Sequence, residues 1–404
     1  MDNTGAVELF DPAEHEPLVE DEWDESVARS FVERILREAD DAYDPDRGWP
    51  LHPEDRYGPD NVAGRGLYCG ATGTMWALTR LARRYRMTLR NDYDAGAERC
   101  EERYRAHPTE TGTVVPSYFL GTVGMLAARF AISGDPKLLD RMLDEMRANA
   151  GNPAREVLWG SPGTALPALL VRERDGDDRF DDMLRSVQDE LWATWEPADA
   201  EGGLLWEQDL YGRRCRYVGA GHGAIGNLAP LVRAAGLLSD ERREALFARV
   251  PALLETYAMR CGGAANWWSL AAPRFGTRMQ WCHGAPGVVI GLAGYPTGDE
   301  RVENLLIEAG EGIWRAGPLK KGPTLCHGTA GNGLALLRLA ERTGADHWKR
   351  RAERFAMHAI RQVEQWREAF GMPTFSLWTG ELGVAWYIDA VLRNEPALLT
   401  LDTL

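Results

Sequence analysis

A short glycine motif, G-x-x-G, recurs seven times along this chain of 404 residues and restricts its possible folds more than any other feature. Each copy precedes a stretch whose apolar residues fall on one helical face, as in TMWALTRLARRY and NGLALLRLAERTG. The first glycines of successive copies are separated by 51, 39, 63, 61, 44 and 52 residues. These glycines are Gly70, Gly121, Gly160, Gly223, Gly284, Gly328 and Gly380. Because each interval can hold two helices and two loops, the repeat predicts seven helical hairpins.

The stretches between the glycine motifs are more charged and predict the outer helix of each hairpin. An example is DPKLLDRMLDEMRANAG, whose narrow apolar stripe leaves one side of the helix for solvent. Seven hairpins can stack as an open solenoid or close into a ring. The units vary in length and keep their unusual residues at the glycine turn, which favours closure. We therefore predict an all-α, (α/α)7 toroid of seven inner and seven outer helices, with all glycine turns at one end.

Composition and charge restrict the domain organisation and the possible partners. Residues 1–60 are acidic and contain proline, and we expect a lead-in that packs on a single barrel domain formed by residues 61–404. The net charge of -15, without any Lys/Arg block, argues against binding to nucleic acid. No apolar run has the length of a transmembrane segment, and residues 1–30 do not resemble a secretory signal, so we expect a cytoplasmic protein.

Histidines and cysteines gather directly at three of the glycine turns. They are His222 in GAGHGAIG, Cys282 and His283 in WCHGAPG, and Cys326 and His327 in LCHGTAG. Either Cys-His motif alone would suggest a buried thiol beside a helix-capping histidine. Two equivalent motifs favour zinc instead, and a catalytic zinc keeps three protein ligands and one open position, which Cys282, Cys326 and His327 would supply. A closed structural site with His283 as a fourth ligand is the alternative.

These motifs, together with KKGPTLCHGTAGN and the seven turns, make the chain resemble the lanthionine synthetase C-like family from about Gly64 to Tyr387. The resemblance implies a helical toroid with zinc held at one mouth by Cys282, Cys326 and His327. It also implies an enzyme that joins a thiol to a dehydrated amino acid. Bacterial members cyclise a peptide through its own cysteine, whereas eukaryotic relatives add glutathione to such residues in proteins.

The resemblance also suggests individual roles for residues near these motifs. His222 matches the family's proposed acid/base, and Arg278 matches an arginine four residues before the first zinc cysteine. Bacterial cyclases have Asp where this chain has Glu156 and tend to have Tyr where it has His283. Both differences favour glutathione addition over cyclisation.

The chemistry of such an addition suits these residues. Zinc lowers the pKa of a bound thiol, and the thiolate then attacks the β-carbon of dehydroalanine or dehydrobutyrine. The resulting enolate needs a donor or a cation, a task suited to Arg278 or His283. It then needs a proton, which suits His222.

Two of the four lysines, Lys320 and Lys321, lie side by side just before LCHG. They could belong to a solvated loop, or they could bind a glutathione carboxylate or a substrate phosphate. The KKG sequence resembles that of eukaryotic relatives in which a lysine contacts glutathione, so Lys321 is favoured. Two nearby aromatic residues, Tyr217 and Trp281, are expected to pack in the core.

Three other functions fit part of the sequence. A zinc prenyltransferase uses an Asp-Cys-His zinc set, and a sugar-processing (α/α)6 barrel needs two opposed carboxylates. Neither set is found at the glycine turns. A regulatory protein that binds zinc and glutathione without turnover is the third alternative, and the presence of His222 and Arg278 favours an enzyme over it.

Overall fold

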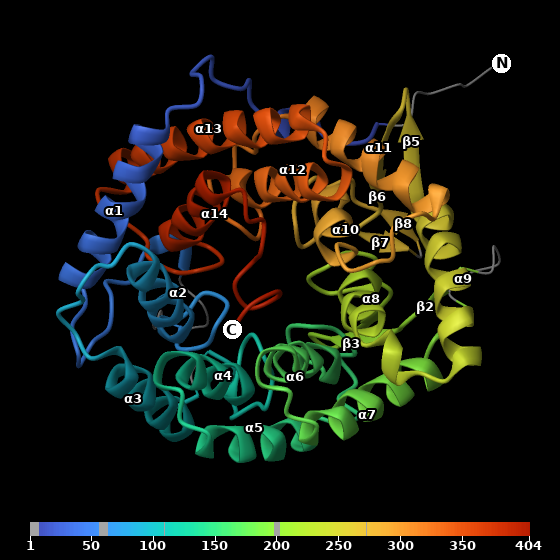
Figure 1. Ribbon diagram of the computed structural model, residues 1–404, viewed down its shortest axis with the longest axis horizontal. Coiled ribbons are helices and arrows are strands. Elements are labelled where there is room, and N and C mark those ends of the chain that lie inside the picture. Colours follow the sequence, from blue (N-terminus) through green and yellow to red (C-terminus); the bar gives the residue numbers. More distant parts are fainter. Residues whose placement is uncertain (1–7, 56–63, 109, 198–202, 272) are drawn as a thin grey trace.

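Two concentric rings of α-helices dominate the computed structural model, which describes residues 8–55, 64–108, 110–197, 203–271 and 273–404 (Figure 1). The inner ring consists of α2 (Ala71–Arg84), α4 (Thr122–Ser133), α6 (Ser161–Asp175), α8 (Ala224–Arg233), α10 (Ala285–Gly291), α12 (Thr329–Thr343) and α14 (Glu381–Arg393). The outer ring consists of α1 (Glu25–Asp41), α3 (Tyr93–Ala106), α5 (Lys137–Ala148), α7 (Arg179–Ala193), α9 (Asp240–Tyr257), α11 (Glu300–Ala316) and α13 (Asp346–Phe370). The all-α, (α/α)7 toroid predicted from the glycine repeat is confirmed.

Each inner helix begins directly after the first glycine of a G-x-x-G motif. The second glycine is needed because the helix passes against the loop that leads into it. A Cβ atom on Gly73 would lie 2.1 Å from the carbonyl oxygen of Leu67, and one on Gly383 would lie 2.0 Å from that of Leu377. No side chain fits at such a distance, so the second position must be glycine. The motif therefore marks a tight turn that all seven hairpins share.

The ring closes where the first outer helix packs on the last inner helix (Figure 1). α1 lies on the N-terminal side of residue 60, in the segment expected to be a lead-in, yet it is the outer helix of the first hairpin. Its buried stripe has helical spacing and consists of Ala28, Phe31, Val32, Ile35, Leu36 and Ala39. The boundary expected at residue 60 falls within 56–63, outside the described residues.

Residues 8–20 run along the outside of the ring. Glu16 accepts a hydrogen bond from His358 of α13 at 2.7 Å, and its backbone N–H donates to the carbonyl of Pro318 at 3.0 Å. Among the residues that the structure describes, three short 3₁₀ helices lie in the connecting segments: Pro12–Glu14, Pro53–Asp55 and Ala235–Leu237.

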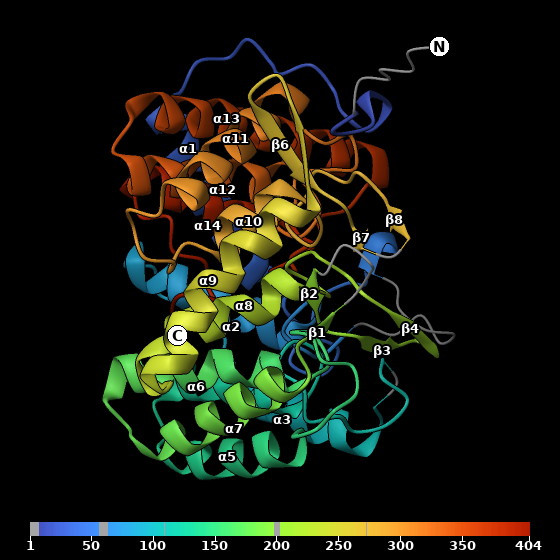
Figure 2. The same cartoon turned by 90° about the vertical axis from the view of Figure 1, so that its right-hand side faces the viewer.

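Within the described ranges, four small antiparallel strand pairs interrupt the helical pattern, a feature that the repeat did not predict. They are β1 (Glu196–Pro197) with β2 (Leu204–Leu205), β3 (Gln208–Leu210) with β4 (Arg213–Cys215), β5 (Ala258–Cys261) with β6 (Ala264–Trp267), and β7 (Leu270–Ala271) with β8 (Arg274–Phe275). They account for the two longest glycine intervals, 63 and 61 residues, which end at Gly223 and Gly284. Figure 2 shows β3, β4, β7 and β8 gathered at one end of the toroid.

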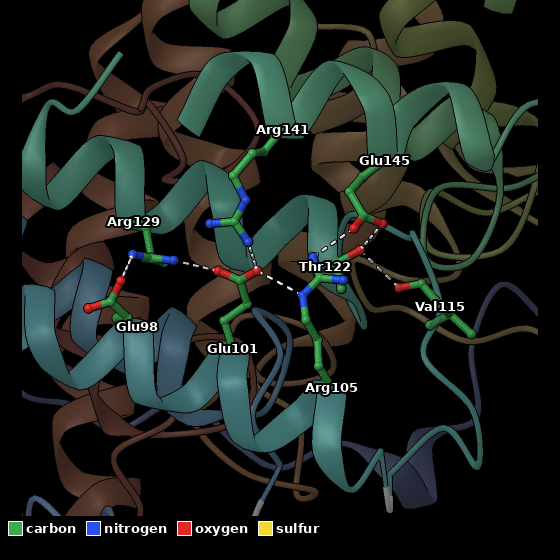
Figure 3. Close-up of polar contacts among 8 residues, drawn as sticks. All are labelled: Glu98, Glu101, Arg105, Val115, Thr122, Arg129, Arg141 and Glu145. Atoms are coloured by element: carbon green, nitrogen blue, oxygen red, sulfur yellow. Dashed lines mark hydrogen bonds and ion pairs between the residues drawn. The ribbon is translucent and has the colours of Figure 1, made fainter. Parts of the chain in front are cut away.

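A buried carboxylate joins two outer helices to an inner one (Figure 3). Glu101 of α3, which is 2% exposed, pairs with Arg105 on its own helix, with Arg129 of α4 at 2.5 Å and with Arg141 of α5. Burial raises the pKa of Glu101, but its arginine partners lower it by more, so the pKa lies below its ordinary value. The ion pairs therefore stabilise the packing of successive hairpins.

Within the part of the chain that the structure describes, no helix has both the length and the apolar character needed to cross a bilayer.

Candidate active site

Two thiols from neighbouring glycine turns meet at one mouth of the toroid. The side chains of Cys282 and Cys326 interact strongly enough for each to shift the pKa of the other, and the backbone N–H of Cys282 donates to the carbonyl of Cys326 at 3.2 Å. Each sulfur also accepts a further hydrogen bond: Cys282 Sγ from Gln280 Nε2 at 2.9 Å, and Cys326 Sγ from the Tyr68 hydroxyl at 2.7 Å. The site thus holds a thiol pair with a donor at each sulfur.

The two thiols differ in acidity. The hydrogen bond from Cys326 lowers the pKa of Cys282 to about 7, against the opposing effect of burial, and Gln280 with the charges of His222 and Lys321 adds to the lowering. Burial raises the pKa of Cys326, and its neighbour Cys282 raises it further. The pKa of Cys282 is thus lowered and that of Cys326 raised. Thiolates are both nucleophiles and metal ligands.

His222, in the turn before α8, is held by a buried carboxylate. Glu156 is fully buried, and its two oxygens accept hydrogen bonds from the backbone N–H groups of Leu158 at 3.0 Å and Trp159 at 2.6 Å. Nδ1 of His222 lies 2.8 Å from Oε2 of Glu156. Because a carboxylate only accepts, this contact assigns the ring proton to Nδ1 and leaves Nε2 available for a substrate.

The pKa of His222 reflects this pairing. Burial lowers the pKa, but the hydrogen bond and negative charge of Glu156, together with Cys282, raise it above the ordinary value. A histidine in this state can both accept and donate a proton near neutral pH.

His283 and Tyr217 stand beside His222. The ring centre of Tyr217 is 6.0 Å from that of His222 and 5.5 Å from that of His283, so this half-buried tyrosine lines the site and does not lie in the core as expected. Burial, followed by the charges of His222 and Arg278, lowers the pKa of His283 to about 3. His283 is therefore neutral, and of the two residues expected to stabilise an enolate only Arg278 carries a charge.

The neighbouring lysines differ in their surroundings. Lys320 donates from Nζ to the backbone carbonyl of Ala13 at 3.0 Å, which ties it to the N-terminal segment. The charge of Lys321, by contrast, contributes to the lowered pKa values of Cys282 and His327 and opposes the rise in the pKa of Cys326. Lys321 is thus the lysine whose charge reaches the thiol pair.

The residues expected to bind zinc are partly assembled. Cys282 and Cys326 are in contact, and burial together with the charges of Lys321 and Arg278 lowers the pKa of His327 to about 4, so its imidazole is neutral. Among the residues that the structure describes, no three His, Cys, Asp or Glu side chains gather closely enough to form a finished metal site. Two thiols and the neutral imidazole of His327, which follows Cys326 in the sequence, are nevertheless zinc-type donors, so the residue types present fit this metal.

A cavity of about 340 Å³ adjoins these groups. Its wall includes Tyr68, Cys69, Glu110, Trp159, Tyr211 and His222. The cavity is therefore bordered by His222 and by Tyr68, whose hydroxyl donates to Cys326 Sγ. A second cavity of about 320 Å³ shares Gly64 and Cys69 with the first.

Two contacting residues, Tyr68 and Gln280, were missed by the sequence analysis. The repeat itself could have revealed Tyr68, because this residue lies two positions before its glycine turn, as Cys282 and Cys326 do before theirs. The packing role expected for Trp281 agrees with its burial against Trp378, at 4.2 Å between ring centres.

Fold and site together define a helical-toroid protein with thiols and histidines at one mouth. The chain belongs to the lanthionine synthetase C-like family, because the sequence profile described as "Lanthionine synthetase C-like protein" matches residues 27–402.

Individual relatives match over shorter stretches. Glutathione S-transferase LANCL1 of Danio rerio is 30% identical over 255 residues, which cover 60% of this chain and 60% of the relative. LanC-like protein GCL1 of Arabidopsis thaliana is 38% identical over 89 residues, which cover 21% of this chain and 20% of the relative. The match therefore spans less than two thirds of the length of these curated relatives.

A solved structure extends the comparison to the fold. Nisin cyclase superposes with a TM-score of 0.56 at 15% identity, over 92% of this chain and 100% of that chain. This likeness shows the shared toroid.

Proposed function

We propose that this protein is a zinc-dependent enzyme that adds a thiol, from glutathione or a peptide cysteine, to a dehydroalanine or dehydrobutyrine residue. The observation that carries the proposal is the Cys282–Cys326 thiol pair, whose Cys282 lies within electrostatic reach of a histidine held by Glu156. The relative named glutathione S-transferase supports glutathione as the thiol. As the sequence predicts, we place the reaction in the cytoplasm.

The proposed zinc site lies at the mouth of the toroid that holds the two thiols. Cys282, Cys326 and His327 would hold zinc, which when bound lowers the pKa of an incoming thiol. Lys321 contributes a positive charge that attracts a carboxylate of glutathione to the same mouth. The dehydrated residue then occupies the cavity bordered by Tyr68 and His222.

His222 carries the proton through the reaction. Nε2 of His222 takes the proton of the attacking thiol, while Glu156 stabilises the resulting imidazolium through Nδ1. The sulfur forms a bond to the β-carbon, and the electron pair of the C=C bond moves to give an enolate. Arg278 stabilises the negative oxygen, and His222 returns the proton to the α-carbon, so the thiol and the dehydrated residue combine without loss of any atom.

The proposal is tested by mixing the zinc-loaded protein with glutathione and a dehydroalanine peptide and following the adduct by mass spectrometry. His222→Ala should retain zinc but lose about 10²–10⁴-fold in rate, the usual contribution of a positioned acid/base. His347, an exposed histidine at the start of α13, supplies the control, since His347→Ala should react like the wild type.

Further arms of the assay separate the alternatives. A peptide that carries its own cysteine, offered beside glutathione, shows which thiol is used and whether the protein is a cyclase. A zinc-loaded wild type that never exceeds the uncatalysed rate on any dehydrated peptide would overturn the enzyme and leave a zinc- and glutathione-binding regulatory protein.

A further inference from the structure

Two of the seven inner helices carry an asparagine directly after the second glycine of their turn. These are Asn227 in GAIGN on α8 and Asn332 in GTAGN on α12. The other five turns have, at the same repeat position, Thr74, Met125, Thr164, Val288 and Val384. Both asparagines are fully buried, where a polar side chain is costly without a reason.

The amide of Asn227 holds the loop that presents Glu156. Its Nδ2 donates to the carbonyl oxygen of Arg155 at 2.9 Å. Arg155 has a φ of 44°, a left-handed conformation that a non-glycine residue adopts only when its surroundings impose it. The next residue is Glu156, whose carboxylate orients His222. Asn227 therefore fixes the backbone from which the carboxylate reaches the histidine.

The amide of Asn332 holds the loop that presents Cys282 in the same way. Its Nδ2 donates to the carbonyl oxygen of Met279 at 2.9 Å. The next residue is Gln280, whose amide donates to Cys282 Sγ. A third buried asparagine, Asn266, donates to the carbonyl oxygen of Arg278 at 3.2 Å, so two successive carbonyls of this loop are held.

Each of the asparagines on α8 and α12 makes one hydrogen bond and leaves one polar atom unpaired. Within the described part of the chain, Oδ1 of Asn227 and Oδ1 of Asn332 are buried without a hydrogen-bond partner. A buried acceptor without a partner is destabilising, which offsets part of what the amide hydrogen bond contributes to stability. Each asparagine donates one hydrogen bond to a backbone carbonyl. In both cases the residue that follows this carbonyl in the sequence, Glu156 or Gln280, has its side chain in the site.

We propose that Asn227 and Asn332 are positioning residues, the first for the Glu156–His222 pair and the second for the Gln280–Cys282 contact. The effect on turnover rests on the proposed function, whereas the effect on local geometry does not. Neither asparagine needs to touch a substrate, because each acts through the backbone carbonyl that it holds.

The test uses the full-length protein with Asn227→Leu, Asn332→Leu and a matched control. Thr164 is the control, because it occupies the same repeat position and its hydroxyl donates to Ser161 in its own helix at 2.6 Å. Asn227→Leu should lower the pKa of His222, measured by NMR titration, and reduce kcat at least tenfold while KM for glutathione changes less than twofold. Asn332→Leu should speed zinc release to a chelator about tenfold, as loss of outer support around a metal site commonly does. Thr164→Val should change none of these quantities.

The readouts also keep the two hypotheses apart. If the leucine variants did not fold, Asn227→Ser and Asn332→Ser, too short to reach the carbonyls, should give the same shifts. Unchanged His222 titration and unchanged zinc release would overturn the inference and make the asparagines packing residues. A wild type without turnover would defeat the proposed function alone, since titration and zinc release would still be measured. In a protein that bound no zinc, severalfold slower alkylation of Cys282 in Asn332→Leu would support the inference, and an unchanged rate would overturn it.

Discussion

Nδ1 of His222 lies 2.8 Å from Oε2 of Glu156, although 66 residues separate the two along the chain. They lead into consecutive inner helices, α8 and α6, and meet because the turns of neighbouring hairpins lie at the same mouth. A carboxylate at this position sets both the tautomer and the basicity of the histidine.

Replacing Glu156 by Gln should lower the pKa of His222, because the negative charge that opposes the effect of burial would be lost, whereas the amide oxygen could still accept from Nδ1. The limb of the kcat/KM pH profile that reports His222 should move to lower pH, and the rate near neutral pH should fall about 10–100-fold. Glu156→Asp, which keeps the charge, should retain more activity. A Gln variant with an unchanged pH profile would contradict the pairing.

Each thiol ligand should be required for zinc. Cys282→Ala and Cys326→Ala should both lose the metal in elemental analysis of purified protein, because each removes one of the two sulfurs that lie together. His283→Ala should keep its zinc if the fourth position is open to substrate. Full retention of zinc in both cysteine variants would refute this assignment.

The two adjacent lysines should behave differently. Lys321→Ala should weaken glutathione binding, measured by calorimetry on the zinc-loaded protein, by about 1.5–3 kcal/mol through loss of a charge-assisted contact. Lys320→Ala is the natural control, because its ammonium already binds the carbonyl of Ala13. Equal affinities in wild type and Lys321→Ala would assign both lysines to an ordinary surface loop.

Glu101 should contribute to stability in a pH-dependent way. Because its folded-state pKa is lowered, the stabilisation is fully present above the unfolded value of about 4.3 and is lost as pH falls through the folded value. Glu101→Gln should reduce the free energy of unfolding near pH 7 by about 3 kcal/mol, since the buried guanidinium of Arg129 would lose the negative charge of Glu101.

A nearby carboxylate offers the comparison for Glu101. Glu98 also pairs with Arg129, but its side chain is 55% exposed, so Glu98→Gln should cost less than about 1 kcal/mol. Denaturant unfolding at pH 7 and pH 4 measures both variants. Similar losses of unfolding free energy in the two variants would show that the buried ion pairs of Glu101 contribute no more to stability than the exposed pair of Glu98.

The repeat predicted the toroid because a tight glycine turn leaves a mark in local sequence. The same logic could have placed α1 in the ring, since Phe31, Ile35 and Leu36 follow the helical spacing of an outer helix. The acidic and proline-containing surroundings of this helix suggested a lead-in instead. The strand pairs beside Gly223 and Gly284 are too short, two to four residues each, to leave a periodic signal.

Side-chain partners were harder to predict than helices. The contact of Tyr68 with Cys326 spans 258 residues and depends on how the first and sixth hairpins meet across the closed ring. Likewise, the separate surroundings of Lys320 and Lys321 depend on a backbone carbonyl of Ala13 that lies 307 residues away from Lys320. The local sequence pattern identified which residue types form the site. The partners of these residues come from segments that are distant in the sequence.

Closure of the ring by α1 and α14 also bears on how the protein is made. During synthesis α1 leaves the ribosome before the other helices of the ring, and its apolar stripe lacks its main partner until α14 emerges. Contacts across such a sequence separation form late in folding, and the exposed surface is open to chaperones in the meantime. Trp378 of the last hairpin links the two residues of the Tyr68–Cys326 contact, because its carbonyl accepts from the backbone N–H of Cys326 and its own N–H donates to the carbonyl of Tyr68. The backbone around the thiol site is therefore complete only after translation of the last hairpin.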